Sequence, residues 1–176
     1  MTGHLHLAAP ADTAAADWSR KGAIRVVLAE DHALMRRSLR LLLDSQDGVD
    51  VVAEAGDLST VVSCVHRNLP DVLVLDLGMP SESSIEVVRC LRADLPRTEI
   101  VVLTMEDSPW FAQQALDVGA IGFVLKDFAD TELPEAVRDA ARGQEYLSPR
   151  VAARMQSIRR HVSDGVLTVR ETSSGP

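Results

Sequence analysis

Four apolar runs in this chain each end on a side chain that can do chemistry. Glu30 and Asp31 follow the run IRVVLA, Asp76 follows VLVL, Thr104 ends EIVVLT, and Lys126 follows GFVL. These runs lack the polar alternation of a half-exposed strand, so they predict strands of a parallel sheet that is buried on both faces. The reactive side chains therefore stand at strand ends, which is where an open α/β sheet binds its ligands.

These residue types suit the transfer of a phosphoryl group. Three carboxylates at one rim repel one another and require cations; Lys126 supplies one positive charge, and Mg²⁺ supplies the rest. The hydroxyl of Thr104 and the ammonium of Lys126 would neutralise the oxygens of the transferring group. Asp76 is then the nucleophile and forms an acyl phosphate. The simpler alternative is that Asp76 only opens the turn that precedes Pro80.

Strand and helix alternate five times along the chain. The crossovers are short, so the natural closure is a right-handed parallel sheet with helices on both faces. We therefore predict an α/β fold, a doubly wound five-stranded parallel sheet of strand order 2-1-3-4-5, which is the flavodoxin-like order. This order brings the five reactive side chains to one rim. The predicted strands cover 24–29, 49–55, 72–75, 99–104 and 122–125, with a helix after each.

Two of the helices carry local start signals. Ser108 is predicted to be an N-cap, with Pro109 at the first helical position. The last helix is predicted to start at Asp130 or Thr131. That start would put Pro134 in the first turn, where its missing N–H costs little.

The composition limits the classes of function. A chain of 176 residues with 46% hydrophobic content suits one globular domain with a sizeable core. The net charge of −8 argues against binding nucleic acid by charge alone. Cys64 and Cys90 lie in apolar helical patterns without metal-ligand spacing, and we interpret both as small core residues. The sequence has neither a membrane-length apolar run nor a secretory signal, so we expect a cytoplasmic location.

The chain resembles the receiver domain of two-component response regulators. The resemblance covers about residues 25–142 and extends more loosely through YLSPRVAARM. A receiver assignment agrees with the predicted strand order and with the chemistry inferred for the rim. The matching pieces are AEDH with Glu30 and Asp31, VLDLGMP with Asp76, VLT with Thr104, and GFVLKD with Phe123 and Lys126.

The resemblance implies a role for each matching residue. Asp76 would accept a phosphoryl group from a sensor histidine kinase. Mg²⁺ would be bound directly by Asp31, Asp76 and the backbone carbonyl of Gly78, and through water by Glu30.

The remaining matching residues would respond to phosphorylation of Asp76. Thr104 would move to bond the phosphoryl group, and Lys126 would pair with it. Phe123 stands where the family keeps a rotating switch aromatic. The alternative for Phe123 is an ordinary core residue, and the two are compatible because a ring can be buried in one state and less so in another.

Several residues depart from the family pattern. Glu30 replaces the commoner Asp, and Met105 follows Thr104 where small residues are frequent. Gly78 offers no side chain two residues beyond the nucleophile, so the lifetime of a phosphoryl group there is left open. Asp127, rather than Pro, follows the lysine, which resembles the class whose output is a LuxR-type helix-turn-helix domain.

We predict three segments: a disordered leader over 1–22, the receiver domain over 23–143, and a linker helix with a tail over 144–176. In the last segment, 149–160 is typical of a short basic helix. The residues VLTVRE resemble the opening of a LuxR-type DNA-binding domain, although a chance match is the alternative. The sequence lacks the recognition helix of such a domain, so DNA binding is expected only through an output domain not present here. Either the regulator is truncated, or it is a single-domain receiver with a residual tail.

The predicted function is a phosphorylation-activated signalling switch that controls transcription, rather than a turnover enzyme. Phosphorylation would favour a homodimer through the fourth and fifth helices with strand five, or through the first and fifth helices. One alternative is a metal-dependent phosphatase. Such an enzyme generally requires a second acid two residues after the nucleophile to protonate the leaving group, and Gly78 stands at that position. The other is a receiver fold that acts by protein–protein interaction without phosphorylation.

Overall fold

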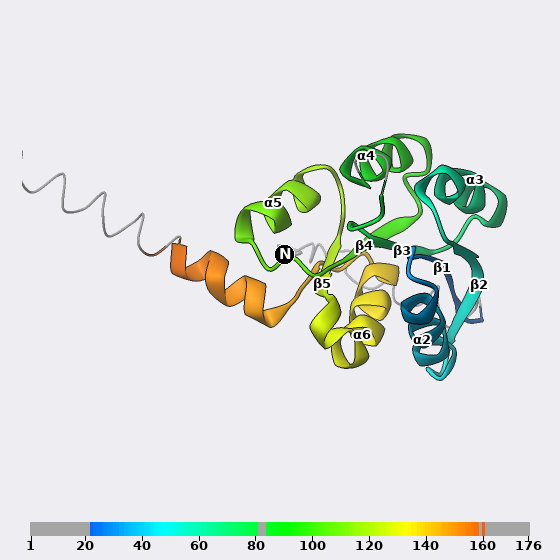
Figure 1. Ribbon diagram of the computed structural model, residues 1–176, viewed down its shortest axis with the longest axis horizontal. Helices are drawn as coiled ribbons and strands as arrows, with labels where there is room; N and C mark the ends of the chain where they lie inside the picture. Colours follow the sequence, from blue (N-terminus) through cyan, green and yellow to red (C-terminus); the bar gives the residue numbers. More distant parts are fainter. Residues whose placement is uncertain (1–21, 81–83, 159, 161–176) are drawn as a thin grey trace, which may run out of the picture.

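One parallel sheet of six strands in the order β2-β1-β3-β4-β5-β6 forms the centre of the fold. The computed structural model describes residues 22–80, 84–158 and 160. Helices α3, α4 and α5 cover one face of the sheet, and α2 and α6 cover the other (Figure 1). The strands are β1 (Ile24–Ala29), β2 (Val49–Ala55), β3 (Val72–Asp76), β4 (Glu99–Thr104), β5 (Gly122–Leu125) and β6 (Tyr146–Leu147). The helices are α2 (Ala33–Asp44), α3 (Leu58–Asn68), α4 (Ser84–Asp94), α5 (Pro109–Asp117), the 3₁₀ turn η1 (Lys126–Phe128) and α6 (Ala129–Ala141).

The predicted order of the first five strands is confirmed, and all of them pair in parallel. The sixth strand was not predicted. It has two residues, Tyr146 and Leu147, which pair in parallel with Gly122 and Phe123. Two residues are too few to show a periodic pattern, so the sequence does not predict this strand. It forms along the free edge of β5.

Both faces of the sheet are packed, which explains the continuous apolar runs. Leu73 and Leu75 of β3 point into the cluster shared with α3, α4 and α5. Val72 and Val74 of the same strand point into the cluster shared with α2 and α6. Successive side chains of a strand alternate between faces, so a strand with helices on both sides must be apolar throughout.

The last helix differs from the prediction in where it starts. The turn η1 leads directly into α6, so the helix begins at Ala129 rather than at Asp130 or Thr131. Pro134 consequently lies inside the helix and not in its first turn. Because Pro has no N–H, the carbonyl four residues earlier loses its helical partner at this position.

Both ends of α5 lie where the sequence places them. Ser108 is the N-cap and Pro109 the first residue, although the Ser108 side chain makes no capping hydrogen bond. Gly119 follows the C-cap with a φ of 107°. A Cβ at Gly119 would lie 2.7 Å from Arg92 Cγ, so both the backbone conformation and the packing favour glycine.

One of the two cysteine predictions was wrong. Cys64 is half-buried on α3, whereas Cys90 is exposed on α4. Its neighbours Val88 and Leu91 are buried, and Cys90 lies on the other side of the helix.

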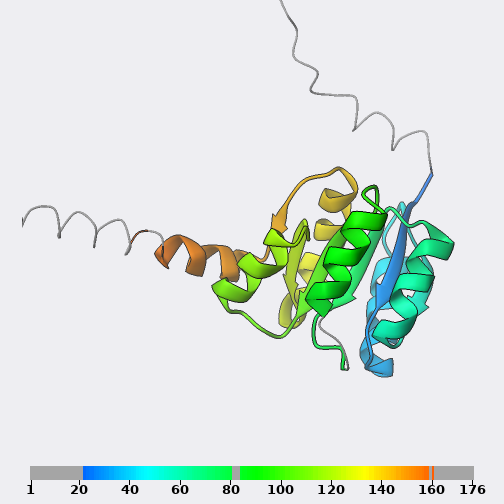
Figure 2. The same ribbon diagram turned by 90° about the horizontal axis from the view of Figure 1, so that it is seen from above.

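After β6 the chain continues as a helix over 149–158, drawn in orange at the end of the described chain (Figures 1 and 2). Val151 of this helix is fully buried. The predicted leader over 1–22, apart from Gly22, and the stretch VLTVRE lie outside the described residues. Within the described part of the chain, no helix combines the length and the apolar content that crossing a bilayer requires.

Candidate functional site

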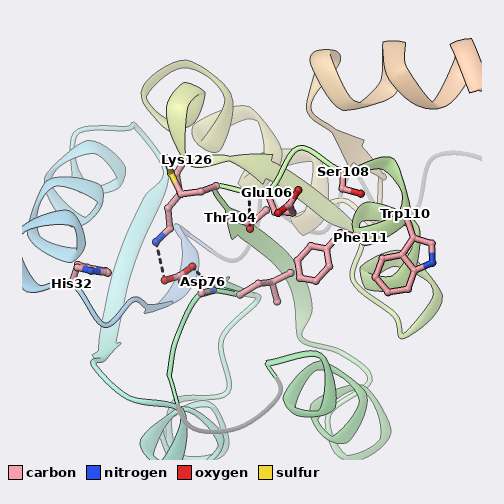
Figure 3. A pocket seen from close by; sticks show the side chains of 11 residues that line it. His32, Asp76, Thr104, Glu106, Ser108, Trp110, Phe111 and Lys126 are labelled. Atoms are coloured by element: carbon pink, nitrogen blue, oxygen red, sulfur yellow. Dashed lines mark hydrogen bonds and ion pairs between the residues drawn. The ribbon is translucent and has the colours of Figure 1, made fainter.

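Lys126 lies between two carboxylates at the rim where the strands end. Its Nζ is 2.7 Å from Glu30 Oε2, which follows β1, and 2.8 Å from Asp76 Oδ2, which ends β3. Figure 3 shows the contact between Lys126 and Asp76. Parallel strands put their carboxyl ends at one edge, so residues far apart in the sequence meet here.

The three charged groups are withdrawn from water. Glu30 is fully buried, Asp76 is 1% exposed, and the Lys126 side chain is 7% exposed. Burial lowers the pKa of the Lys126 ammonium, but hydrogen bonds and charge contacts with Asp76 and Glu30 outweigh burial and leave that pKa raised. Lys126 therefore stays charged and neutralises part of the rim.

The negative charge at the rim exceeds what Lys126 balances. Glu30, Asp31, His32 and Asp76 each offer a ligand atom, and these atoms lie within 4.8 Å of one another. Glu30 Oε2 and Asp76 Oδ2 face Lys126, and Asp31 Oδ1 faces His32. Beyond those contacts, these three buried oxygens find no hydrogen-bond donor among the described residues. Three carboxylates with spare acceptor capacity fit Mg²⁺, which prefers oxygen ligands.

Asp76 is held by the loop that follows its strand. Its Oδ1 accepts a hydrogen bond of 2.8 Å from the backbone N–H of Gly78. A Cβ at Gly78 would lie 3.2 Å from the same oxygen. The absence of a side chain at Gly78 thus leaves space directly beside the Asp76 carboxylate.

Thr104 lines the same pocket as Asp76 and Lys126. The pocket has a volume of about 610 Å³. Thr104 is 4% exposed, and its Oγ1 accepts a hydrogen bond of 3.1 Å from the backbone N–H of Glu106. Phe111 and Trp110 form the wall on the side away from His32 (Figure 3).

Phe123 lies in the core and does not line the pocket. Its ring is fully buried in the cluster between the sheet and α3, α4 and α5. It stands on β5, three residues before Lys126, which begins the 3₁₀ turn η1. This position agrees with an ordinary core residue, and its predicted role as a switch aromatic stays a prediction.

Residues 26–138 match the response regulator receiver domain family. The chain belongs to this family. Receiver domains are signalling components of two-component systems rather than enzymes that turn over a substrate. The resemblance seen in the sequence is therefore confirmed at the level of the family.

Similar curated proteins include response regulators and transcriptional regulatory proteins. The receiver is 36% identical over 137 residues to the uncharacterized transcriptional regulatory protein YxjL of Bacillus subtilis (strain 168), which covers 78% of this chain and 63% of that protein. It is 39% identical over 127 residues to the nitrate/nitrite response regulator protein NarP of Escherichia coli (strain K12), covering 72% of this chain and 59% of NarP. The chain thus spans about three fifths of the length of these relatives.

Solved structures that are similar to this chain are also response regulators or their receiver domains. A LuxR-family two-component response regulator from Aurantimonas sp. SI85-9A1 superimposes with a TM-score of 0.75 at 31% identity, covering 78% of this chain and 98% of that one. The receiver domain of the NarL regulator of Mycobacterium tuberculosis superimposes with a TM-score of 0.66 at 37% identity, covering 70% and 99%. The LuxR-type class inferred from the sequence is confirmed by these relatives.

Two residues near the site were not predicted from the sequence. His32 Nδ1 lies 3.0 Å from Asp31 Oδ1 and 3.2 Å from Glu30 Oε1. Asp107, three residues after Thr104, forms ion pairs with Arg150 and Arg154 of the helix over 149–158. His32 was detectable because it directly follows the two acids, whereas no local pattern indicates the partners of Asp107.

Proposed function

We propose that this receiver is a phosphorylation-activated switch in which Asp76 accepts a phosphoryl group from a sensor histidine kinase. The observation that supports this most is the position of Lys126, whose ammonium contacts both Glu30 and Asp76. Thr104 and Lys126 line the same pocket as Asp76, so a residue with a hydroxyl and one with an ammonium lie at the same site.

The proposed transfer is a displacement at phosphorus. One oxygen of the Asp76 carboxylate forms a bond to phosphorus while the N–P bond of the donor phosphohistidine breaks. The electron pair of that bond returns to the imidazole nitrogen, and the product is an acyl phosphate on Asp76. Lys126 and the Thr104 hydroxyl would neutralise the phosphoryl oxygens, because the negative charge of the transferring group spreads over them.

Mg²⁺ is the proposed cofactor. Asp31, Asp76 and the backbone carbonyl of Gly78 would hold it directly, and Glu30 would act through water. When bound, the ion supplies neutralisation of phosphoryl charge. The carboxylate oxygens with spare acceptor capacity support this assignment.

The proposed readout passes through Thr104 and Phe123. Thr104 would turn toward the phosphoryl group, and the buried Phe123 ring would change its packing, which shifts a two-state equilibrium. The result would be a homodimer that controls transcription through a LuxR-type output domain. A solved structure of two RcsB dimers bound to two parallel DNAs, whose chain is 28% identical to this one, supports the proposal of a dimer that acts on DNA.

The test is incubation of the full chain with acetyl phosphate and Mg²⁺, followed by intact mass measurement. We expect a labile adduct of one phosphoryl group that Asp76→Asn abolishes. The matched control is Asp94→Asn, an exposed acid on α4 outside the rim, which should retain the adduct. Hydrolysis of stable phosphomonoesters would instead indicate a phosphatase. No adduct and no change in size-exclusion behaviour with beryllofluoride would indicate a module that acts without phosphorylation.

A further inference from the structure

His32 occupies an unusual place for an N-cap residue. It is the N-cap of α2, but its side chain makes no capping hydrogen bond. The ring turns instead toward the acids, with its Nδ1 near Asp31 and Glu30. Its side chain is 75% exposed and lines two adjoining pockets, so solutes can reach the ring.

The spacing of these donor atoms suits a bound cation. With metal–ligand bonds of about 2.1 Å, neighbouring donors lie about 3.0 Å apart around a six-coordinate ion and about 3.4 Å apart around a four-coordinate ion. The Nδ1 of His32 is 3.0 Å from Asp31 Oδ1 and 3.2 Å from Glu30 Oε1. The ring nitrogen and the two carboxylates therefore already have the separation of adjacent ligands.

The charge at this point also favours a cation. Glu30, Asp31 and Asp76 bring three negative charges, and Lys126 brings one positive charge. The N-terminus of α2 adds only about half a positive charge. A net negative charge remains beside an imidazole.

A mixed set of oxygen and nitrogen donors differs from what Mg²⁺ selects. Mg²⁺ prefers oxygen ligands, whereas imidazole suits Zn²⁺, Ni²⁺ and other late transition metals, whose affinity for nitrogen donors is higher. We propose that His32 is a further ligand of the cation site. Through His32 Nδ1 the site would bind a late divalent transition metal as an alternative to Mg²⁺, which uses the oxygen ligands alone. This inference rests on the proposed function only in using the same acidic site.

The distances around His32 also suit a ring N–H that donates to a carboxylate, so the experiment must separate coordination from hydrogen bonding. The chain has five histidines, and three of them, His4, His6 and His161, lie outside the described residues. We would replace these three with alanine in the full chain. Co²⁺ binding would then be measured by calorimetry and by the visible absorption spectrum of the ion, with Mg²⁺ titrated in parallel.

We expect His32→Ala to weaken Co²⁺ binding about tenfold or more and to alter the visible spectrum, which reports nitrogen coordination. Mg²⁺ affinity should change less than about twofold, because Mg²⁺ does not depend on nitrogen. The matched control is His66→Ala on α3. The Nε2 of His66 lies 3.8 Å from Asp94 Oδ2, away from the rim, and its removal should change neither ion.

Two results would overturn the inference. Unchanged Co²⁺ binding in His32→Ala would mean that the ring is not a ligand. Equal weakening of Co²⁺ and Mg²⁺ would mean that His32 acts only by holding the carboxylates. Asp31→Asn separates this from a failure of the proposed function: it should weaken both ions, and if it weakens neither, the acidic rim is not the cation site at all.

Discussion

Lys126 shows how a single side chain sets the charge balance of the rim. Its pKa is lowered by burial and raised more strongly by Asp76 and Glu30. A group with a raised pKa contributes stability that is present at low and neutral pH and lost as the pH rises through the raised value. The Lys126 ammonium is therefore charged throughout the pH range in which phosphoryl transfer would occur.

Tyr146 gives a test of pKa at the residue scale, because it is the only tyrosine of the chain. Burial, followed by the charges of Glu132, Glu135 and Asp139, raises its pKa to about 12. In an absorbance titration of tyrosinate, we expect the folded protein to titrate with a midpoint near this value. Unfolded protein should titrate near the ordinary value of about 10.

The sign of the linked stability follows from proton binding by Tyr146. Between pH 10 and 12 the folded state keeps the phenol proton while the unfolded state loses it, so stability falls as the pH rises through this window. Glu132→Gln should lower the midpoint in the folded state, because it removes one of the charges that disfavour tyrosinate. A folded-state midpoint at the ordinary value would show that the ring is solvated.

At the scale of elements, the helix over 149–158 is attached to the domain by two sets of polar contacts in addition to the buried Val151. Its N-terminal side is tied to β5, since Ser148 N–H donates to the carbonyl of Phe123 and Leu125 N–H donates to Ser148 Oγ. Its exposed side is tied to the loop after Thr104 through Asp107. Both attachments lie within three residues of Thr104 or Lys126, so the helix contacts the two segments that bear the proposed readout.

We expect Asp107→Asn to loosen this helix while leaving the fold intact. Arg150 and Arg154 are more than half exposed, so losing their ion pairs should cost at most about 1 kcal/mol of unfolding free energy. Hydrogen exchange over 149–158 should nevertheless become faster. The matched control is Asp94→Asn, which changes an exposed acid on α4. Equal exchange in both variants would mean that buried Val151 alone fixes the helix.

At the scale of the whole molecule, repulsion among the carboxylates of the acidic rim lowers the unfolding free energy, and a bound cation reduces this repulsion. Buried like charges disfavour the folded state when no cation is present, and functional sites commonly carry such a cost. Apolar side chains are packed on both faces of the sheet, and their burial offsets the repulsion at the rim.

We therefore expect Asp76→Asn to raise the unfolding free energy by about 1 kcal/mol when Mg²⁺ is removed by a chelator, since Lys126 still pairs with Glu30. Mg²⁺ at a hundred times its Kd should stabilise the wild-type protein by about 2.7 kcal/mol. It should stabilise the variant less, because one carboxylate is gone. Urea unfolding with and without Mg²⁺ measures both effects. A variant that is less stable than the wild-type protein without Mg²⁺ would mean that the charges are already balanced.

The sequence by itself determined the first five strands, their order and the residues at their ends. An uninterrupted apolar run requires a strand that is covered on both faces, and the residue that ends such a run must lie at the ligand-binding rim. Glu30, Asp76, Thr104 and Lys126 were found in this way. Helix details were less secure, because the start of α6 and the exposure of Cys90 depend on how neighbouring segments pack.

Only the tertiary structure decided which side chains touch across the chain. Asp107 and Arg154 are 47 residues apart, and Ser148 and Leu125 are 23 residues apart. The short strand β6 and the direction of the His32 ring likewise depend on surfaces that form after the sheet has assembled. Periodicity reports which face of an element is buried, but it does not report what that face meets, because contact between distant segments is fixed by packing in three dimensions.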